Sequence, residues 1–295
     1  MIYTVTFNPA LDYVMHTGTL ISGKTNRSRG EELYFGGKGI NVSYVLSQLG
    51  VPTTALGFVA GFTGDALEAA VKDWGIKTDF VHLANGLTRI NVKLKGECET
   101  EINAQGPAID KDALDALFLK LDVIKNGDTL VLAGSVPSSL PSDIYESILK
   151  RLSGRGVRFV VDATGKLLEN TLQFKPFLIK PNIDELCEVL NIKIETEEEL
   201  IAAAKRLQEK GAQNVLVSLG GDGAVLLADD GKIYKKPACK GTPVNTVGCG
   251  DSMLAGFLAG HKKGAEYALS LGVAAGGATA FKPWLANKED ILKLL

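Results

Sequence analysis

The hydrophobic positions of the chain fall into short apolar runs separated by longer stretches with helical spacing. The apolar runs, rich in Val, Ile and Leu, cover residues 2–7, 54–59, 129–133, 158–161, 177–180 and 215–219. The stretches with helical spacing cover residues 40–49, 64–74, 113–125, 143–152 and 200–210. This alternation is typical of β–α–β units, in which helices cover a buried parallel sheet. We therefore predict an α/β fold.

Three of the predicted helices are followed directly by a glycine, at Gly50, Gly75 and Gly211. Many helices end on a residue in the left-handed conformation, which glycine adopts at little cost because it has no Cβ. We therefore expect these three helices to end there.

Two stretches interrupt the α/β pattern, at residues 11–34 and 88–104. The second indicates two strands, 89–94 and 98–103, joined by a tight turn at 95–97. We expect both stretches to form a small separate β layer, which is either a flap over an active site or a hairpin without function. Beyond residue 240 small residues predominate, and residues 248–260 and 272–280 are predicted to be closely packed helices.

Composition fits one large globular domain, residues 1–295, with this small β layer inserted. The chain is 45% hydrophobic and 22% charged. Its 32 Lys and Arg against 34 Asp and Glu give a net charge of −2, so we expect no nucleic-acid or membrane partner, and any anion site must be local. The uncharged run 267–281 is too short to span a bilayer. Four scattered cysteines and a start without signal-peptide features predict reduced thiols in the cytoplasm.

A glycine cluster opens the first predicted helix. Gly36, Gly37, Lys38 and Gly39 precede Ile40 and Asn41. Glycines allow a ligand to approach the backbone, the start of a helix favours an anion, and Asn41 could hydrogen-bond a sugar hydroxyl. The same residues would also fit a tight turn before an ordinary helix, so this motif alone leaves both interpretations open.

A second glycine motif, Gly248-Cys249-Gly250-Asp251, precedes another apolar helix. Successive backbone N–H groups there could form a nest for a phosphoryl group. Asp251 could then accept a proton from an attacking hydroxyl, as a phosphotransferase base does. Aspartate also caps helices very often, and the residues alone favour that simpler role.

Polar residues follow two predicted sheet strands at their carboxyl ends, where open α/β folds bind ligands. They are Lys180, Asn182 and Glu185 after one strand and Ser218, Gly220, Gly221 and Gly223 after the other. Asn182 and Glu185 could hold Mg²⁺, directly or through water. Taken singly, each is also an ordinary turn or helix-start residue.

Two other nucleotide motifs are excluded by their context. Residues 18–25 match the phosphate-loop pattern, but the segment that follows, 26–32, is polar, contains Gly30 and has no apolar face. A dinucleotide fingerprint at Gly248 and Gly250 would place Met253 at its third glycine.

Together, the two glycine motifs resemble the two signatures of the ribokinase-like (pfkB) carbohydrate kinases. The resemblance extends over nearly the whole chain and includes residues 8–12, 133–137, 180–182 and 218–220. Residues 26–27, 88–91 and 101–107 are similar to the branch that acts on ketohexose phosphates. The resemblance implies a ribokinase-like fold: a central, mostly parallel sheet flanked by helices, with a small β-sheet lid from segments 11–34 and 88–104. A homodimer formed through the lid is also expected.

The resemblance further implies a role for each matching residue. Asp251 would be the general base. The backbone amides of Gly248, Cys249 and Gly250 would stabilise the transferring phosphoryl group. The sugar phosphate would be bound by Asp12, Arg27, Gly36, Gly37, Lys38, Asn41, Arg89, Asn103 and Ser135. ATP would be bound by Lys180, Asn182, Ser218, Gly220, Gly221 and Gly223, and Mg²⁺ by Glu185.

Cys249 stands where the family more often has alanine or serine. Because the start of a helix lowers the pKa of a thiol, we expect Cys249 to be sensitive to alkylation or oxidation.

Overall fold

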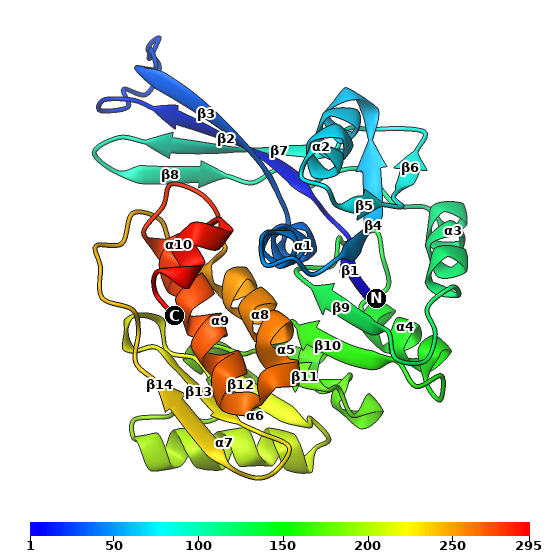
Figure 1. The fold of residues 1–295 in the computed structure, drawn as a ribbon. Coiled ribbons are helices and arrows are strands. Elements are labelled where there is room, and N and C mark those ends of the chain that lie inside the picture. Colours follow the sequence, from blue (N-terminus) through cyan, green and yellow to red (C-terminus); the bar gives the residue numbers. More distant parts are fainter.

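The body of the molecule is built on a ten-stranded sheet, and the computed structural model describes residues 1–295 (Figure 1). The strand order is β14-β13-β12-β11-β10-β9-β1-β4-β5, and β6 pairs with β4. The strands are β1 (Ile2–Thr6), β4 (Thr53–Ala60), β5 (Lys77–Thr78), β6 (Val81–Leu83), β9 (Thr129–Ala133), β10 (Arg158–Asp162), β11 (Leu178–Ile179), β12 (Asn214–Ser218), β13 (Ala224–Leu227) and β14 (Ile233–Lys236). All pairs are parallel except β12–β13 and β13–β14. The predicted α/β fold is confirmed.

Helices cover both faces of this sheet because its strands are apolar on both sides. In β9, Leu130 and Leu132 belong to one hydrophobic core, and Val131 and Ala133 belong to another on the opposite face. The first core includes residues of α3 (Lys111–Leu121), α4 (Ile144–Leu152), α5 (Gly165–Glu169), α6 (Ile183–Leu190) and α7 (Glu197–Glu209). The second includes residues of α1 (Lys38–Gln48), α8 (Cys249–Gly260), α9 (Ala265–Ala280) and α10 (Lys288–Leu292). The single-turn helices are η1 (Leu172–Phe174), η2 (Gly220–Asp222) and η3 (His261–Lys263).

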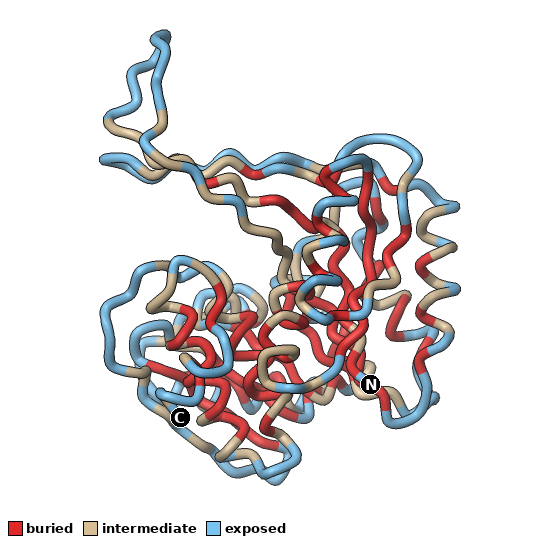
Figure 2. Tube along the Cα trace, turned by 45° about the horizontal axis from the view of Figure 1, so that its top comes forward, coloured by how far each residue is buried: buried red, intermediate tan, exposed pale blue.

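A second, four-stranded sheet extends away from the body (Figure 2). Its order is β3 (Gly30–Gly36), β2 (Ala10–His16), β7 (Arg89–Lys95) and β8 (Glu99–Ile102). β2 and β7 pair in parallel, and β3 and β8 pair antiparallel on the two outer sides. The predicted hairpin is therefore present, and the segment before the glycine cluster supplies the other two strands.

The predicted helix ends and the interpretation of residues 18–25 are confirmed. Gly50, Gly75 and Gly211 have φ values of 76°, 75° and 134° after their helices. Residues 18–25 lie in the connection between β2 and β3. A phosphate loop leads into a helix, whereas a strand follows these residues, so they are not a phosphate loop. All four cysteines are free. None of the helices is both long and apolar enough to cross a membrane.

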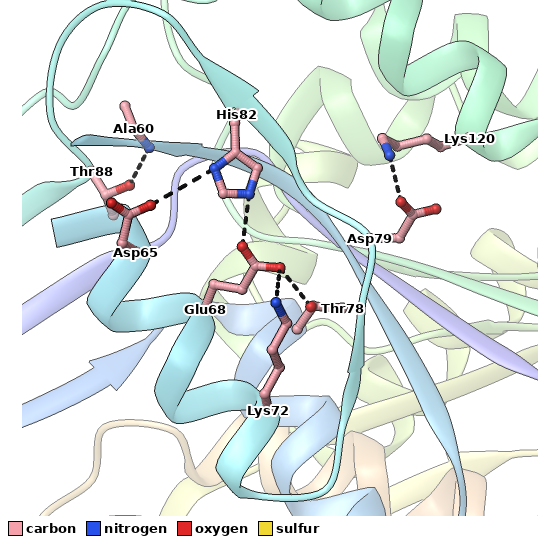
Figure 3. A network of polar contacts seen from close by, with 9 residues as sticks. All are labelled: Ala60, Asp65, Glu68, Lys72, Thr78, Asp79, His82, Thr88 and Lys120. Carbon is pink, nitrogen blue, oxygen red and sulfur yellow. Dashed lines mark hydrogen bonds and ion pairs between the residues drawn. The ribbon is translucent and has the colours of Figure 1, made fainter. Parts of the chain in front are cut away.

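A polar network fastens the edge of the main sheet to α2 (Gly61–Asp73) (Figure 3). The Glu68 carboxylate lies 2.7 Å from His82 Nε2, accepts a 2.7 Å hydrogen bond from the Thr78 hydroxyl and pairs with Lys72 at 3.0 Å. Burial would raise the pKa of Glu68, but the hydrogen bonds from Thr78 and Lys72 hold the pKa below its ordinary value. These residues line none of the cavities described below, and the network joins β5 and β6 to α2.

The first turn of α1 is pressed against the end of β1. A Cβ on Gly39 would lie 2.6 Å from Thr6 Oγ1 and 2.8 Å from the Val5 carbonyl oxygen, so only glycine fits. The Thr6 hydroxyl accepts a 3.1 Å hydrogen bond from the backbone N–H of Ile40. The glycine cluster thus brings the start of α1 to the carboxyl edge of the sheet, where the other site residues lie.

Candidate functional site

A cavity of about 710 Å³ opens at the carboxyl edge of the main sheet. Because the central strands are parallel, the residues that follow them meet at this edge. The start of α1 and the start of α8 border the cavity, and the small sheet contributes Asp12 and Arg89. A second cavity of about 760 Å³ adjoins the first and shares Gly37, Lys38, Arg89 and Asp162 with it.

Asp251 lies in the first turn of α8 and is 5% exposed. Its carboxylate does not cap its own helix, because the cap residue is Gly248 and no side-chain cap bond is present. Instead, Asp251 Oδ2 accepts a 2.8 Å hydrogen bond from Asn41 Nδ2 on α1. The two glycine motifs, about two hundred residues apart in the chain, therefore meet through this bond, and the capping interpretation of Asp251 is wrong.

The pKa of Asp251 is raised to about 6. Burial is the main cause, and the nearby negative charge of Asp162 adds to it. The hydrogen bond from Asn41 and the charges of two lysines act in the opposite direction. A carboxyl group with this pKa is largely ionised at pH 7 yet basic enough to take a proton from a substrate.

Two lysines flank a buried carboxylate beside Asp251. Asp162, at the end of β10, is 1% exposed and lies 3.4 Å from both Lys38 Nζ and Lys180 Nζ. Burial would lower the pKa of Lys38, but the carboxylates of Asp162 and Asp251 help to raise it above its ordinary value. A Cβ on Gly250 would lie 3.0 Å from Lys180 Nζ, so this ammonium group is next to the start of α8. The arrangement holds positive charge where a phosphoryl group could sit.

Asn182 and Glu185 form a capping box at the start of α6. Asn182 Oδ1 accepts from the Glu185 N–H at 2.8 Å, and Glu185 Oε2 accepts from the Asn182 N–H at 2.9 Å. Both residues line the main cavity. Since one carboxylate oxygen of Glu185 takes no part in the box, these residues fit a Mg²⁺ ion that keeps most of its water ligands.

On the side of the small sheet, Asp12 is held by two neighbours on β7. Asn91 Nδ2 donates to Asp12 Oδ1 at 2.8 Å, and Lys93 Nζ lies 3.2 Å from Asp12 Oδ2. The buried oxygens Asn91 Oδ1 and Asn41 Oδ1 have no hydrogen-bond partner within the chain. Buried polar atoms are normally satisfied, so these two amides favour a ligand with hydroxyl groups between them.

Arg89 lies between the two cavities. Its guanidinium donates to the Asn8 carbonyl oxygen at 3.2 Å and to the Ala104 carbonyl oxygen at 3.4 Å. No carboxylate pairs with it at salt-bridge distance, so its charge is available to an anion in the second cavity, which Ser135 also lines.

Most of the predicted site residues meet in the main cavity. These are Asp12, Gly37, Lys38, Asn41, Arg89, Lys180, Asn182, Glu185, Ser218, Gly220, Gly221, Gly223, Gly248, Cys249, Gly250 and Asp251. Ser135 lines the second cavity, and Gly36 lines a third one of about 400 Å³ beneath the small sheet. Arg27 and Asn103 line none of the three and are exposed, in the loop between β2 and β3 and just after β8.

The expectation that Cys249 has a lowered pKa is wrong. Burial raises the pKa of the Cys249 thiol to about 11, and the negative charge of Asp251 contributes in the same direction. Its Sγ also lies 3.7 Å from the Asn245 carbonyl oxygen, to which it can donate. Burial and the charge of Asp251 raise the pKa more than the start of the helix lowers it, so the thiol stays protonated.

Sequence reasoning missed Asp162 and Asn91. Asp162 is the last residue of an apolar strand, as Ser218 is, and the same edge rule could have found it. Asn91 lies opposite Asp12 in the β2–β7 register, which a single sequence does not show.

Comparison with known proteins gives consistent matches over the full chain. The sequence model described as pfkB family carbohydrate kinase matches residues 5–290. The chain is 45% identical to the 1-phosphofructokinase of Bacillus subtilis, covering 100% of this chain and 97% of the relative. It is 38% identical to the D-tagatose-1-phosphate kinase of Bacillus licheniformis, covering 100% and 96%. The crystal structure of phosphofructokinase-2 from Escherichia coli in complex with substrates and products superposes with a TM-score of 0.93 at 28% identity, covering 99% of this chain and 97% of that one.

Proposed function

Because the chain belongs to the pfkB family of carbohydrate kinases, we propose that it transfers the γ-phosphoryl group of ATP to the C6 hydroxyl of fructose 1-phosphate. The products are fructose 1,6-bisphosphate and ADP. The observation that carries this proposal is that the cavity of the buried carboxylate Asp251 adjoins a second cavity, with the cationic residues Arg89 and Lys38 lining both. A hydroxyl can react at the first while a phosphate is held at the second.

In this mechanism Asp251 takes the proton of the C6 hydroxyl as its oxygen attacks the γ-phosphorus. The bond from that phosphorus to the β-phosphate oxygen breaks, and ADP leaves with the electron pair. Backbone amides at Gly248, Cys249 and Gly250 stabilise the charge that develops on the transferred group. Lys38 and Lys180, oriented by Asp162, add positive charge at the same place. Asn41 keeps the Asp251 carboxylate in position.

The nucleotide occupies the part of the main cavity between β12 and α9. Ser218, Gly220, Gly221 and Gly223 border it with backbone that a phosphate chain can approach closely. Its apolar wall, suited to a base, is formed by Val273, Gly276, Gly277, Ala280 and Phe281. Mg²⁺, when bound, neutralises phosphate charge, and Glu185 would hold it through water.

The orientation of the sugar separates the proposal from its competitors. Tagatose 6-phosphate kinase is the alternative enzyme, and a relative acting on D-tagatose 1-phosphate shares the phosphate position proposed here. A sensor without catalytic activity is a further alternative on the same fold. A binding protein has no need for a buried carboxylate with a raised pKa at the phosphoryl site. The burial and the raised pKa of Asp251 therefore favour an enzyme.

The test is an ADP-release assay with Mg-ATP and four sugars at equal concentration: fructose 1-phosphate, tagatose 1-phosphate, fructose 6-phosphate and tagatose 6-phosphate. We expect kcat/KM for fructose 1-phosphate to exceed each of the others at least about tenfold, which corresponds to about 1.4 kcal/mol of discrimination. A preference for either 6-phosphate would reverse the orientation of the sugar, and no ADP with any sugar would favour the sensor.

The raised pKa of Asp251 predicts an acid limb in the pH profile. Because the base must be ionised, kcat/KM should fall as the pH drops below about 6. In Asp162→Asn the limb should move to lower pH, since the negative charge of Asp162 helps to raise the pKa of Asp251. Initial rates from pH 4.5 to 8 measure both profiles. A limb that stays in place in Asp162→Asn would contradict the assignment of Asp251 as the titrating group.

The small sheet supports a proposed homodimer, because one of its faces carries an apolar row that is partly exposed. In the register of the sheet, Leu33, Tyr13, Val92 and Ile102 lie in one row across the four strands. Leu33 is 47% and Ile102 59% exposed, whereas Asp12 and Asn91, on the opposite face, point toward the site. Burying this row against a second copy removes apolar surface from water and leaves the sheet free to act as a lid.

We therefore expect Leu33→Asp to raise the dimer dissociation constant about 10–100-fold, because the interface would bury an unpaired charge. Sedimentation velocity over a concentration series measures this constant. Leu119→Asp is the matched control, since Leu119 is 68% exposed on α3, away from the small sheet. A wild-type protein that remains monomeric at high concentration would contradict the dimer.

A further inference from the structure

Lys166 places an unassigned positive charge in the second cavity. It belongs to α5, which follows β10 and Asp162 in the chain. Lys166 lines the second cavity but not the main one, and its side chain is exposed. Its ammonium group forms neither a hydrogen bond nor an ion pair within the chain, whereas those of Lys38 and Lys180 both lie close to Asp162. Its ammonium group is therefore free to meet a ligand.

The charges of the second cavity do not balance. Its charged side chains are Lys38, Arg89, Lys166 and Asp162. The single carboxylate already lies between two lysines, one of which, Lys180, is outside this cavity. Arg89 and Lys166 are thus left without a carboxylate partner. The wall also carries five hydroxyl groups, from Thr6, Ser135, Ser138, Ser142 and Thr164.

This composition fits a doubly charged anion with several acceptor oxygens. A phosphate monoester has two negative charges near neutral pH and accepts hydrogen bonds at three oxygens. Arg89 can bind such a group with two parallel N–H donors, while the flexible lysine adds a point charge from another direction. A neutral hydroxymethyl group at the same position would leave both cations unpaired.

We propose that Lys166 is a specificity-determining residue that contacts the phosphate already present on the sugar substrate. With Arg89, it makes the enzyme select phosphorylated over unphosphorylated ketohexoses. The inference rests on the proposed function and adds to it a residue outside the recognised motifs. The contact is made equally in the ground state and the transition state, so Lys166 affects substrate KM rather than kcat.

The test compares Lys166→Met and Lys166→Arg with wild type, using whichever of the four sugar phosphates the wild type turns over best. For Lys166→Met we expect KM for the sugar phosphate to rise about tenfold, with kcat and KM for ATP within about twofold of wild type. Lys166→Arg should recover most of the affinity. KM of Lys166→Met should also depend less steeply on salt than that of wild type, because one charge contact is missing.

Lys262→Met is the matched control, since Lys262 is an exposed lysine that lines none of the three cavities and should leave every constant unchanged. Turnover by Lys166→Met with unchanged sugar-phosphate KM would refute the role of Lys166 and leave the proposed function standing. An equal rise in KM for ATP would also refute it. Absence of turnover by the wild type with all four sugars would instead refute the proposed function, and this inference with it.

Discussion

Asp251→Asn is expected to lower kcat by about 10²–10⁴-fold while ATP binding stays within about threefold of wild type. The substitution keeps the size of the side chain, and an amide oxygen at this position can still accept the hydrogen bond from Asn41. The start of α8 is unaffected, because Asp251 does not cap the helix. Only the capacity to take a proton is removed, so rapid-quench turnover and nucleotide titration separate the chemical step from binding.

Asp184→Asn is the control for that result. Asp184 lies in the first turn of α6 and is exposed outside the cavities, so the same chemical change there should leave kcat unaltered. If Asp251→Asn kept turnover within a few-fold of wild type, Asp251 would not be the base, and the raised pKa would only reflect its burial.

Gly248→Ala is expected to lower kcat by about 10²-fold, the effect of losing one well-placed N–H donor from a site that stabilises developing charge. Gly248 has a φ of 79°, which disfavours any residue with a Cβ, and that Cβ would lie 2.6 Å from Leu285 Cδ2. The Leu285 side chain can move away, but the backbone strain displaces the amides that follow, at Cys249 and Gly250. Steady-state kinetics give the loss, and thermal unfolding shows whether the fold is retained.

Gly231→Ala separates backbone strain from damage to the site. Gly231 has a similar φ of 77°, and a Cβ there would meet nothing within 4 Å. We expect this variant to lose about 1 kcal/mol of folding stability with unchanged kcat. Equal activity losses in the two glycine variants would mean that the amides near Gly248 have no particular role.

The central strands and main helices could be predicted because their patterns are strong and local. Residues 129–133 form β9 with the predicted bounds, and the hairpin β7–β8 is present. By contrast, α6 has only eight residues, and β14 has alternating exposed and half-buried residues that carry a weak signal. Short elements of this kind depend on tertiary packing more than on their own sequence.

The candidate site could be predicted where glycine and charge occur together in one motif, as at Lys38 and Asp251. It could not be predicted where partners come from separate strands. Asn91 lies next to Asp12 only because of the β2–β7 register. Asp162 pairs with two lysines that come from separate parts of the chain. Arg27 and Asn103 are predicted in the site because their segments resemble the family, but Arg27 lies in the loop between β2 and β3 and Asn103 just after β8, both exposed. Their binding roles remain predictions.

Phosphoryl transfer to C6 is tested most directly by the structure of the product formed from fructose 1-phosphate and Mg-ATP, determined by ³¹P and ¹³C NMR. We expect one new phosphate ester on C6, formed in equal amount with ADP, in wild type and at a much lower rate in Asp251→Asn. Release of ADP with inorganic phosphate and unchanged fructose 1-phosphate, or a new ester on any other carbon, would contradict it.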